Sequence, residues 1–251
     1  KKACARRSNN ALSIIADVWD WVTDKLKENW SPQQIAGVHG GLSHMSIYRY
    51  IWTNKRKGGR LWQCLRRKAK PYRQRLTAET RGRINDRVSI HERPSIVDAR
   101  TRIGDWEADT IIGQHHKQAI VTLVERKTGL LKMKRVDNKT AQQVSEAMIE
   151  LLKPVRLQVK TITSDNGKEF AQHKKVKQKL FSPFFFADAY ASWQRGTNEN
   201  TNGLIREYLP KGCDFRQVSD DEMQDIENKL NNRPRKRLGF KTPMQAFYNI
   251  N

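Results

Sequence analysis

The sequence predicts an α/β fold that is preceded by an all-α region. Within the first 56 of the 251 residues, apolar side chains recur at helical spacing. From Gly104 onward, short β-prone runs alternate with helical patterns and are separated by turns that contain glycine. Because domains cluster near about 100 to 150 residues, we expect two folded units, residues 1–56 and 101–251, joined by a basic linker over residues 57–100.

The first unit is expected to hold three helices. The first runs from Asn9 to Lys27, where one apolar stripe consists of Leu12, Ile15, Trp19, Val22 and Leu26. The motif Ser31-Pro-Gln-Gln34 predicts the start of the second helix, because it offers an N-cap serine, a proline at the first helical position and a glutamine at the third. Gly40-Gly41 supplies a tight turn, and Ser43 caps a third helix that carries Met45, Ile47, Tyr48, Ile51 and Trp52.

Helix, short glycine turn and helix form a helix-turn-helix pattern, which is typical of DNA binding. The second helix of such a motif enters the major groove, so its polar candidates for base contacts are His44, Ser46 and Arg49. An ordinary helical hairpin without groove contact is the alternative. DNA binding is favoured by the basic residues that follow the motif, which are Lys55, Arg56, Lys57, Arg60, Arg66 and Arg67.

The charge of the chain points to a polyanionic partner. The net charge is +22 at pH 7, and residues 1–100 hold 22 Lys and Arg against 8 Asp and Glu. No acidic residue lies between Glu28 and Glu79. Lysine and arginine side chains on phosphates release condensed counterions, so we expect nucleic acid as the partner. A solvated basic face or a targeting signal is the alternative.

The sequence also indicates a compartment. No apolar run approaches the roughly 18 residues that a membrane span needs. Cys4, Cys64 and Cys213 are few and far apart, so neither a disulfide framework nor a paired-cysteine zinc site is predicted, and a reducing cytoplasm fits. Because the chain starts at Lys1 without an initiator methionine or a signal-peptide pattern, we expect a fragment of a longer protein.

The linker is expected to carry one helix around Thr77 to Val88, and Pro94 prevents the helix from continuing further. Outside that helix it is expected to lie along DNA rather than to form a compact domain.

The second unit is expected to be an RNase H-like, integrase-type core. Strands are predicted over residues 105–112, 119–125, 130–136, 159–164 and 184–186, helices over 140–152 and 193–208, and a further helix after the capping box Ser219-Asp-Asp-Glu222. Three strands, a helix, a strand, a helical segment, a strand and a helix is the element order of RNase H-like domains. This analogy concerns the fold and does not by itself assign chemistry.

Three carboxylates fall at positions where these elements can bring them together. Asp109 lies within the first strand, Asp165 at the end of the fourth, and Glu199 near the start of a helix after the fifth. If the first and fourth strands are adjacent, the two aspartates face each other and the helix brings Glu199 over them. Carboxylate oxygens suit Mg²⁺, and two such ions can stabilise the attacking and leaving oxygens of a displacement at phosphorus. Asp109 would be shared by both ions.

Other acids compete for this role. Asp105 and Glu107 share the strand parity of Asp109, so they can point to the same face of the sheet. Glu169 is a weaker candidate, because it is placed to cap the next helix.

Three sequence blocks resemble the signatures of the IS30-family transposases, the DDE enzymes of bacterial insertion sequences. They are Gly104-Asp-Trp-Glu-Ala-Asp-Thr-Ile-Ile-Gly113, Ser164-Asp-Asn-Gly-Lys-Glu-Phe170 and Ser192-Trp-Gln-Arg-Gly-Thr-Asn-Glu-Asn-Thr-Asn-Gly-Leu-Ile-Arg206, with 33 residues between Asp165 and Glu199. The resemblance implies Asp109, Asp165 and Glu199 as catalytic acids, two Mg²⁺ ions with Mn²⁺ as a substitute, and binding of terminal inverted repeats. Ala189 stands where relatives often have proline, and a further N-terminal helix-turn-helix region of the family is expected to be missing.

The remaining predictions concern DNA and assembly. Basic residues proposed to contact DNA phosphates in the second unit are Lys168, Arg195, Arg206, Arg233 and Arg235. The sequence thus predicts a DNA transposase that cleaves double-stranded DNA at terminal inverted repeats and joins it to target DNA. A homodimer or higher oligomer in the bacterial cytoplasm, associated with the nucleoid, is expected. The alternatives are an RNase H-type nuclease without strand transfer and a DNA-binding repressor with a degenerate catalytic fold.

Overall fold

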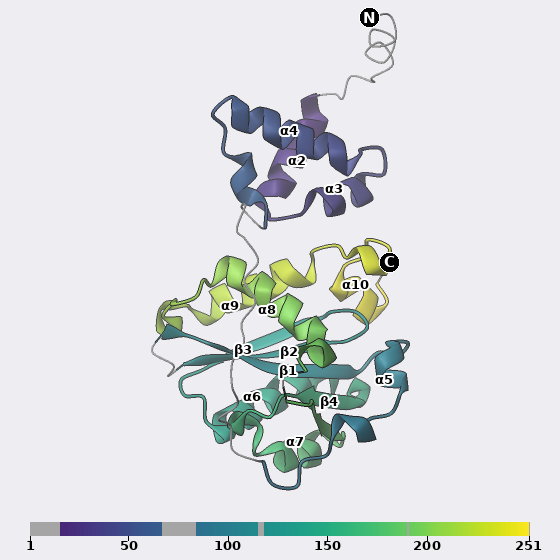
Figure 1. Ribbon diagram of the computed structural model, residues 1–251, viewed down its shortest axis with the longest axis vertical. Coiled ribbons are helices and arrows are strands. Elements are labelled where there is room, and N and C mark those ends of the chain that lie inside the picture. The colour runs from purple at the N-terminus through teal and green to yellow at the C-terminus, as the bar shows by residue number, and fades with distance from the viewer. Residues whose placement is uncertain (1–15, 67–83, 115–117, 190, 251) are drawn as a thin grey trace, which may run out of the picture. The chain divides into compact units, whose positions relative to one another are not determined.

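The computed structural model describes residues 16–66, 84–114, 118–189 and 191–250 (Figure 1). The chain divides into two compact units, Lys1–Gln74 and Arg75–Asn251. None of the helices in the described ranges combines the length and the apolar character that crossing a bilayer requires.

The first unit consists of α2 (Ala16–Lys27), α3 (Pro32–His39), α4 (His44–Arg56) and the 3-10 helix η1 (Leu61–Cys64). Ser31 and Gln34 form the predicted capping box at the start of α3, and Gly40 ends that helix with a φ of 74°. Ser43 caps α4 through the backbone N–H of Met45. The predicted order of helix, glycine turn and helix is therefore present. The expected start of the first helix at Asn9 lies outside the described residues.

The α4 helix buries one face and exposes the other. Ile47 and Ile51, four residues apart, are fully buried in the core of the first unit. Met45 and Trp52 were predicted to belong to the apolar face, but their side chains are 53% and 43% exposed. At 100° per residue both lie opposite the isoleucines, on the same side as exposed Arg49. The apolar pattern of α4 was thus assigned too broadly.

Described parts of the expected linker contribute to both cores. Leu61, Trp62 and Leu65 pack against the core of the first unit. In the second unit Ile84 joins a core cluster, and Ser89 forms a β-bridge with Phe186. The predicted helix from Thr77 to Val88 is wrong over residues 84–88, which are not helical because Asp86 takes a φ of 54° and the Val88 carbonyl accepts the Phe186 N–H. Residues 77–83 lie outside the described part of the chain.

The second unit is built on a five-stranded mixed sheet with the order β3-β2-β1-β4-β5. Its strands are β1 (Asp105–Ile112), β2 (Ala119–Glu125), β3 (Leu131–Val136), β4 (Thr161–Ser164) and β5 (Phe184–Phe186). The first three pair antiparallel, whereas β1, β4 and β5 pair parallel. This is the RNase H-like arrangement that the element order predicts, and the adjacency of the first and fourth strands is confirmed.

Helices cover both faces of the sheet (Figure 1). On one face lie α6 (Ala141–Leu152) and α7 (His173–Leu180), and on the other α8 (Gly196–Tyr208) and α9 (Asp220–Asn231). Trp106 and Ala108 of β1 belong to the α6 and α7 core, where Trp106 also meets Phe247 of α10 (Pro243–Tyr248). Ile111 belongs to the opposite core. The odd-numbered residues of β1, Glu107 and Asp109 among them, therefore face α8.

The core beneath α8 and α9 gives a stability prediction. Phe215, in the 3-10 helix η7 (Phe215–Gln217), is fully buried, whereas Phe181 is 80% exposed. Phe215→Ala is expected to lower the free energy of unfolding by about 3 to 5 kcal/mol, because it leaves a cavity. Phe181→Ala is the matched control and should cost about 1 kcal/mol or less. Urea unfolding of both variants measures the difference, and equal losses would contradict the packing described.

Candidate active site

Asp109 is fixed on β1 by its own strand neighbour and by α8. The Thr110 N–H donates to Oδ1 at 2.9 Å, and the Asn202 side-chain amide donates to Oδ2 at 2.9 Å. Asn202 is itself oriented, since its Oδ1 accepts from the Thr122 hydroxyl of β2 at 3.2 Å. The Asp109 side chain remains 23% exposed. One carboxylate is thus held in place while part of it stays open to solvent.

Asp165 follows the last residue of β4. Its Oδ1 accepts the Gly167 N–H at 2.9 Å, which closes a tight turn directly after the strand. The next residue, Asn166, donates from its side chain to the Ala187 carbonyl at 2.7 Å and is buried. The side chain of Asp165 is 22% exposed. The turn therefore places the carboxylate at the end of a strand that is adjacent to β1.

The two aspartates meet at one guanidinium. Arg195 places Nη1 3.5 Å from Asp109 Oδ2 and Nη2 3.7 Å from Asp165 Oδ2. It closes the 3-10 helix η6 (Ser192–Arg195), immediately before α8. Acids that are 56 positions apart in sequence thus share a single cation.

The surroundings of Asp109 disfavour its negative charge. Burial is the largest cause, and it raises the pKa of the Asp109 carboxyl above the usual range. The carboxylates of Asp165 and Glu169 also raise this pKa, while Arg195 and the Thr110 N–H lower it. A cation at this position would relieve the repulsion between neighbouring carboxylates.

Glu199 lies in the first turn of α8, as predicted, and its side chain is exposed. The helix does pack on β1, but among the described residues no group of three His, Cys, Asp or Glu side chains is close enough to hold a metal ion. The expected assembly of all three acids is therefore not formed here. The pair Asp109 and Asp165 is brought together, and Glu199 is not.

Two of the competing acids have structural partners. Asp105 accepts from the Arg102 guanidinium at 2.9 and 3.0 Å and from the Thr161 hydroxyl at 2.8 Å. Glu169 is buried, pairs with Lys139 at 2.6 Å and accepts from Thr110 at 3.0 Å. The expectation that Glu169 caps the following helix is wrong, because the N-cap of α7 is Gln172, without a side-chain hydrogen bond.

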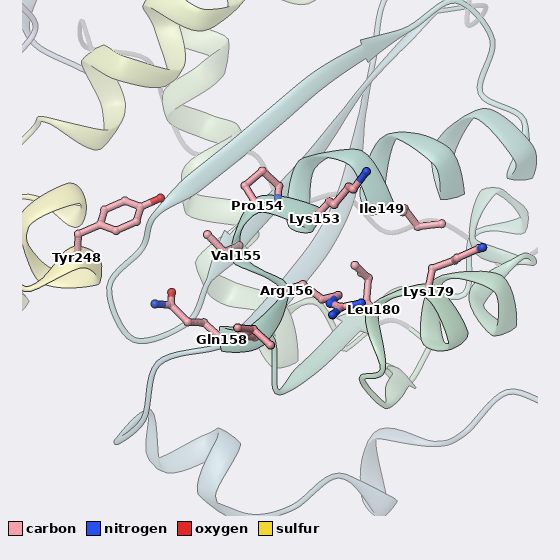
Figure 2. A pocket seen from close by; sticks show the side chains of 10 residues that line it. Ile149, Lys153, Pro154, Val155, Arg156, Gln158, Lys179, Leu180 and Tyr248 are labelled. Atoms are coloured by element: carbon pink, nitrogen blue, oxygen red, sulfur yellow. The ribbon is translucent and has the colours of Figure 1, made fainter.

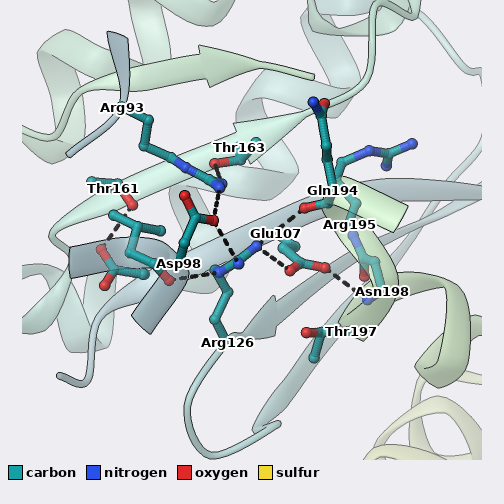
Figure 3. A network of polar contacts seen from close by, with 12 residues as sticks. Arg93, Asp98, Glu107, Arg126, Thr161, Thr163, Gln194, Arg195, Thr197 and Asn198 are labelled. Atoms are coloured by element: carbon teal, nitrogen blue, oxygen red, sulfur yellow. Dashed lines mark hydrogen bonds and ion pairs between the residues drawn. The ribbon is translucent and has the colours of Figure 1, made fainter. Parts of the chain in front are cut away.

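Glu107 belongs to a buried polar network (Figure 3). Its Oε1 lies 2.6 Å from Arg126 Nη1, and its Oε2 accepts the backbone N–H of Asn198 at 2.8 Å. Arg126 also donates to the carbonyls of Gln194 and Val97, both at 3.2 Å. Sequence parity alone did not separate Glu107 from Asp109, since both face α8. Their partners differ, and Glu107 is fully buried.

Several residues predicted to hold DNA phosphates make internal contacts instead. Arg206 donates to the Ile112 carbonyl at 2.6 Å, and Arg233, 3% exposed, donates to the Tyr208 hydroxyl at 2.8 Å. Arg235 donates to the Leu230 carbonyl at 3.0 Å. These placements argue against the predicted phosphate contacts. Lys168, three residues after Asp165, is exposed.

The predicted DNA-contacting residues of the first unit lie mostly on its surface. His44 and Arg49 of α4 are exposed, while Ser46 is half-buried. The basic residues after them are exposed as well, namely Lys55, Arg56, Lys57, Arg60 and Arg66. Arg67 lies outside the described residues. Trp52 was not among the predicted DNA contacts. Its exposed ring lies on the same helix as the basic residues, and the Lys55 ammonium lies 5.3 Å from the ring centroid.

A pocket of about 820 Å³ lies elsewhere in the second unit (Figure 2). It is formed by the 3-10 helix η4 (Lys153–Gln158), the ends of α6 and α7, and Tyr248. Lys153, Arg156 and Lys179 line it, and no carboxylate does. None of the predicted site residues contributes to it, so this pocket is not the candidate active site.

Comparison with known proteins identifies the family. The transposase of insertion sequence element IS4351 from Bacteroides fragilis is 48% identical over 231 residues, which cover 90% of this chain and 71% of the relative. The transposase of IS1086 from Cupriavidus metallidurans is 35% identical over 93% of this chain and 73% of the relative. Transposase InsI of IS30A from Escherichia coli is 36% identical over 89% of this chain and 62% of the relative. The chain belongs to the IS30 family of insertion-sequence transposases.

This transposase is accordingly an enzyme of the DDE type, a polynucleotidyl transferase, as the sequence predicts. No protein-family model matches the chain. A crystal structure of the catalytic core domain of BIV integrase is 21% identical and has a TM-score of 0.46, over 58% of this chain and 93% of that chain. The sheet order and strand directions, rather than this likeness, define the fold.

The raised pKa of Asp109 gives a prediction for the stability of this transposase. The native state holds the Asp109 proton more strongly than the unfolded chain, whose carboxyl has a pKa near 3.8. The protonated Asp109 carboxyl therefore stabilises the native state fully below about pH 3.8, and this stabilisation is lost as the pH rises through the native pKa of the carboxyl. Asp109→Asn does not titrate, so the stability of wild type relative to this variant should fall as the pH rises above the unfolded-state pKa of about 3.8. Metal-free urea unfolding measures it, and a rise would contradict the shift.

Proposed function

We propose that this transposase binds terminal inverted repeats and catalyses Mg²⁺-dependent cleavage and strand transfer of double-stranded DNA. Asp109, Asp165 and Glu199 would hold the metal. The observation that carries the proposal is the convergence of two aspartates, one on β1 and one directly after the adjacent strand β4, on one guanidinium. Such a pair of acids in a basic protein supports a site for a cation and a phosphodiester.

The donor set suits Mg²⁺, which prefers oxygen ligands and retains water molecules. Two such ions, with Mn²⁺ as a substitute, would supply Lewis-acid stabilisation of the attacking and leaving oxygens at phosphorus. The protein orients the ligands itself. Asn202 and the Thr110 N–H fix the Asp109 carboxylate, and the Gly167 N–H fixes that of Asp165. Each aspartate keeps an exposed part toward which a ligand can approach.

Glu199 would complete the ligand set from the first turn of α8. Its near neighbours in that helix are already bound to β1, since Asn198 contacts Glu107 and Asn202 contacts Asp109. In this proposal the exposed Glu199 side chain turns toward the aspartates when the metal and DNA bind.

Recognition of the repeats is assigned by this proposal to the first unit. The exposed face of α4 carries His44 in the first turn and Arg49 in the second, in the N-terminal half of the helix, where a recognition helix contacts base edges. The exposed Lys55, Arg56, Lys57 and Arg60 continue the basic surface. In the second unit Lys168, three residues after Asp165, is exposed, and Trp193, two residues before Arg195, is 76% exposed. Since two ends must be joined, a homodimer or higher oligomer at the bacterial nucleoid is part of the proposal.

Substituting the three acids tests the chemistry. Asp109→Asn, Asp165→Asn and Glu199→Gln should each reduce cleavage of labelled terminal-repeat DNA in Mg²⁺ by more than about 100-fold, because an amide is a poor metal ligand. Binding of the same DNA should be retained. Asp225→Asn, which changes an exposed carboxyl of α9, is the matched control and should cleave normally. Retained cleavage in one of the three variants removes that residue from the site.

The products of the same reaction separate the alternatives. A transposase yields nicked and joined DNA, whereas nicks without joined products indicate an RNase H-type nuclease. Binding without cleavage by the wild-type protein indicates a repressor with a degenerate catalytic fold.

Arg49 tests the recognition helix. Arg49→Ala should weaken binding to terminal-repeat DNA by about 1 to 3 kcal/mol and leave binding to a scrambled duplex nearly unchanged, because a base contact is lost. Lys57→Ala should weaken both and reduce the salt dependence by about one charge. Fluorescence anisotropy at several salt concentrations measures these effects. Equal losses on both duplexes for Arg49→Ala would place that residue on the phosphates.

A further inference from the structure

Arg195 lies between Asp109 and Asp165, the two acids that are proposed to hold a metal ion. Its side chain is only 13% exposed, and its two terminal nitrogens each face one carboxylate. Because like charges at close range repel, the two aspartates need a cation in any state in which both are ionised. Within the described residues Arg195 supplies that cation.

The contacts of Arg195 are nevertheless long. Charged N–H donors usually lie about 2.7 to 2.9 Å from a carboxylate oxygen. The distances here are 3.5 and 3.7 Å, and the Ala108 carbonyl lies at 3.4 Å. The buried Nε of Arg195 has no hydrogen-bond partner among the described residues. This guanidinium is therefore held by charge and not by well-formed hydrogen bonds.

Arg126 provides the contrast on the same face of the sheet. It lies 2.6 Å from Glu107 and donates to two backbone carbonyls as well. Figure 3 shows its guanidinium between Glu107 and Asp98, enclosed by partners. Arg126 thus makes close contacts with its carboxylate and with backbone carbonyls, whereas the contacts of Arg195 are longer.

The segment that carries Arg195 has further unsatisfied groups. The Thr197 hydroxyl and both polar atoms of the Asn198 side chain are buried without partners among the described residues. Buried polar groups without hydrogen bonds raise the free energy of the arrangement that contains them. The backbone of the segment is held by the Gln194 carbonyl and the Asn198 N–H, but a movement of the Arg195 side chain alone breaks no well-formed hydrogen bond. Gly196 follows Arg195 directly, and space is open beside its Cα.

We propose that Arg195 is the resident counter-cation of the aspartate pair and that a divalent metal ion displaces it. Arg195 then sets the metal affinity of the site, because the metal must compete with it for the same oxygens. This inference rests on the proposed function, since it takes Asp109 and Asp165 as metal ligands. It adds that the chain carries its own competitor for the metal.

Metal binding by three arginine variants tests the proposal. Arg195→Gln should bind Mn²⁺ at least about fivefold more tightly than wild type, because the metal no longer competes with the guanidinium. Fivefold is about the lower end of the coupling usual between two competing ligands. Arg195→Lys keeps the charge and should stay closer to wild type. Arg216→Gln is the matched control, because it removes the same charge from a side chain that is 70% exposed and paired with Asp214. Its Mn²⁺ affinity should not change.

Isothermal titration calorimetry on the full chain gives the affinities, and the Mg²⁺-induced rise in Tm gives a second readout, which should be larger in Arg195→Gln. One outcome overturns this inference and leaves the metal site intact. In it the wild type binds Mn²⁺, Asp109→Asn abolishes that binding, and Arg195→Gln binds Mn²⁺ no more tightly than the wild type. If neither wild type nor Arg195→Gln binds Mn²⁺, both the metal site and this inference fail. Binding only by Arg195→Gln supports the displacement directly.

Discussion

The buried ion pair between Glu107 and Arg126 is the contact on which the arrangement of the catalytic unit depends. Both side chains are nearly or fully buried, at 0% and 5% exposure. Removing two charges from water is costly, and their attraction compensates only when further hydrogen bonds satisfy the remaining donors and acceptors. Here the second Glu107 oxygen accepts the Asn198 N–H, and Arg126 donates to the Gln194 carbonyl. The same pair therefore fixes the turn before α8 and the first turn of that helix on the sheet.

A second contact sets the direction in which α8 runs. Glu107 and Asp109 are two residues apart on a strand, which spans about 6.6 to 6.8 Å. Their partners Asn198 and Asn202 are four residues apart on a helix, which spans about 6 Å. The two spacings nearly match, so α8 lies along β1 and bonds to it twice in register. Glu199 lies between the two contacts in sequence, so its backbone belongs to the part of α8 that is held on β1, while its side chain is exposed.

Much of this fold could be predicted from the sequence. The strands over 105–112, 119–125 and 184–186 have the predicted bounds, because β-prone runs between turns mark their own ends. The individual arginines could not be assigned, since composition does not show which guanidinium is drawn inside: Arg233 is buried, whereas Arg49 is exposed. Asn202 was missed as the partner of Asp109. Its side-chain amide bonds Asp109, whereas Asn198 bonds Glu107 through its backbone N–H, so the two asparagines alone gave no signal for this contact.

The two acids of β1 that face α8 differ in how they are neutralised. Glu107 is bound at 2.6 Å by an arginine with several other partners, so displacing that cation would leave a buried charge on each side. Asp109 has an arginine at 3.5 Å that lacks a partner for its buried Nε. A metal ion can replace the second cation at a far smaller cost than the first. The strength of the existing counter-ion, rather than the position on the strand, thus separates a structural carboxylate from one that is available for a ligand.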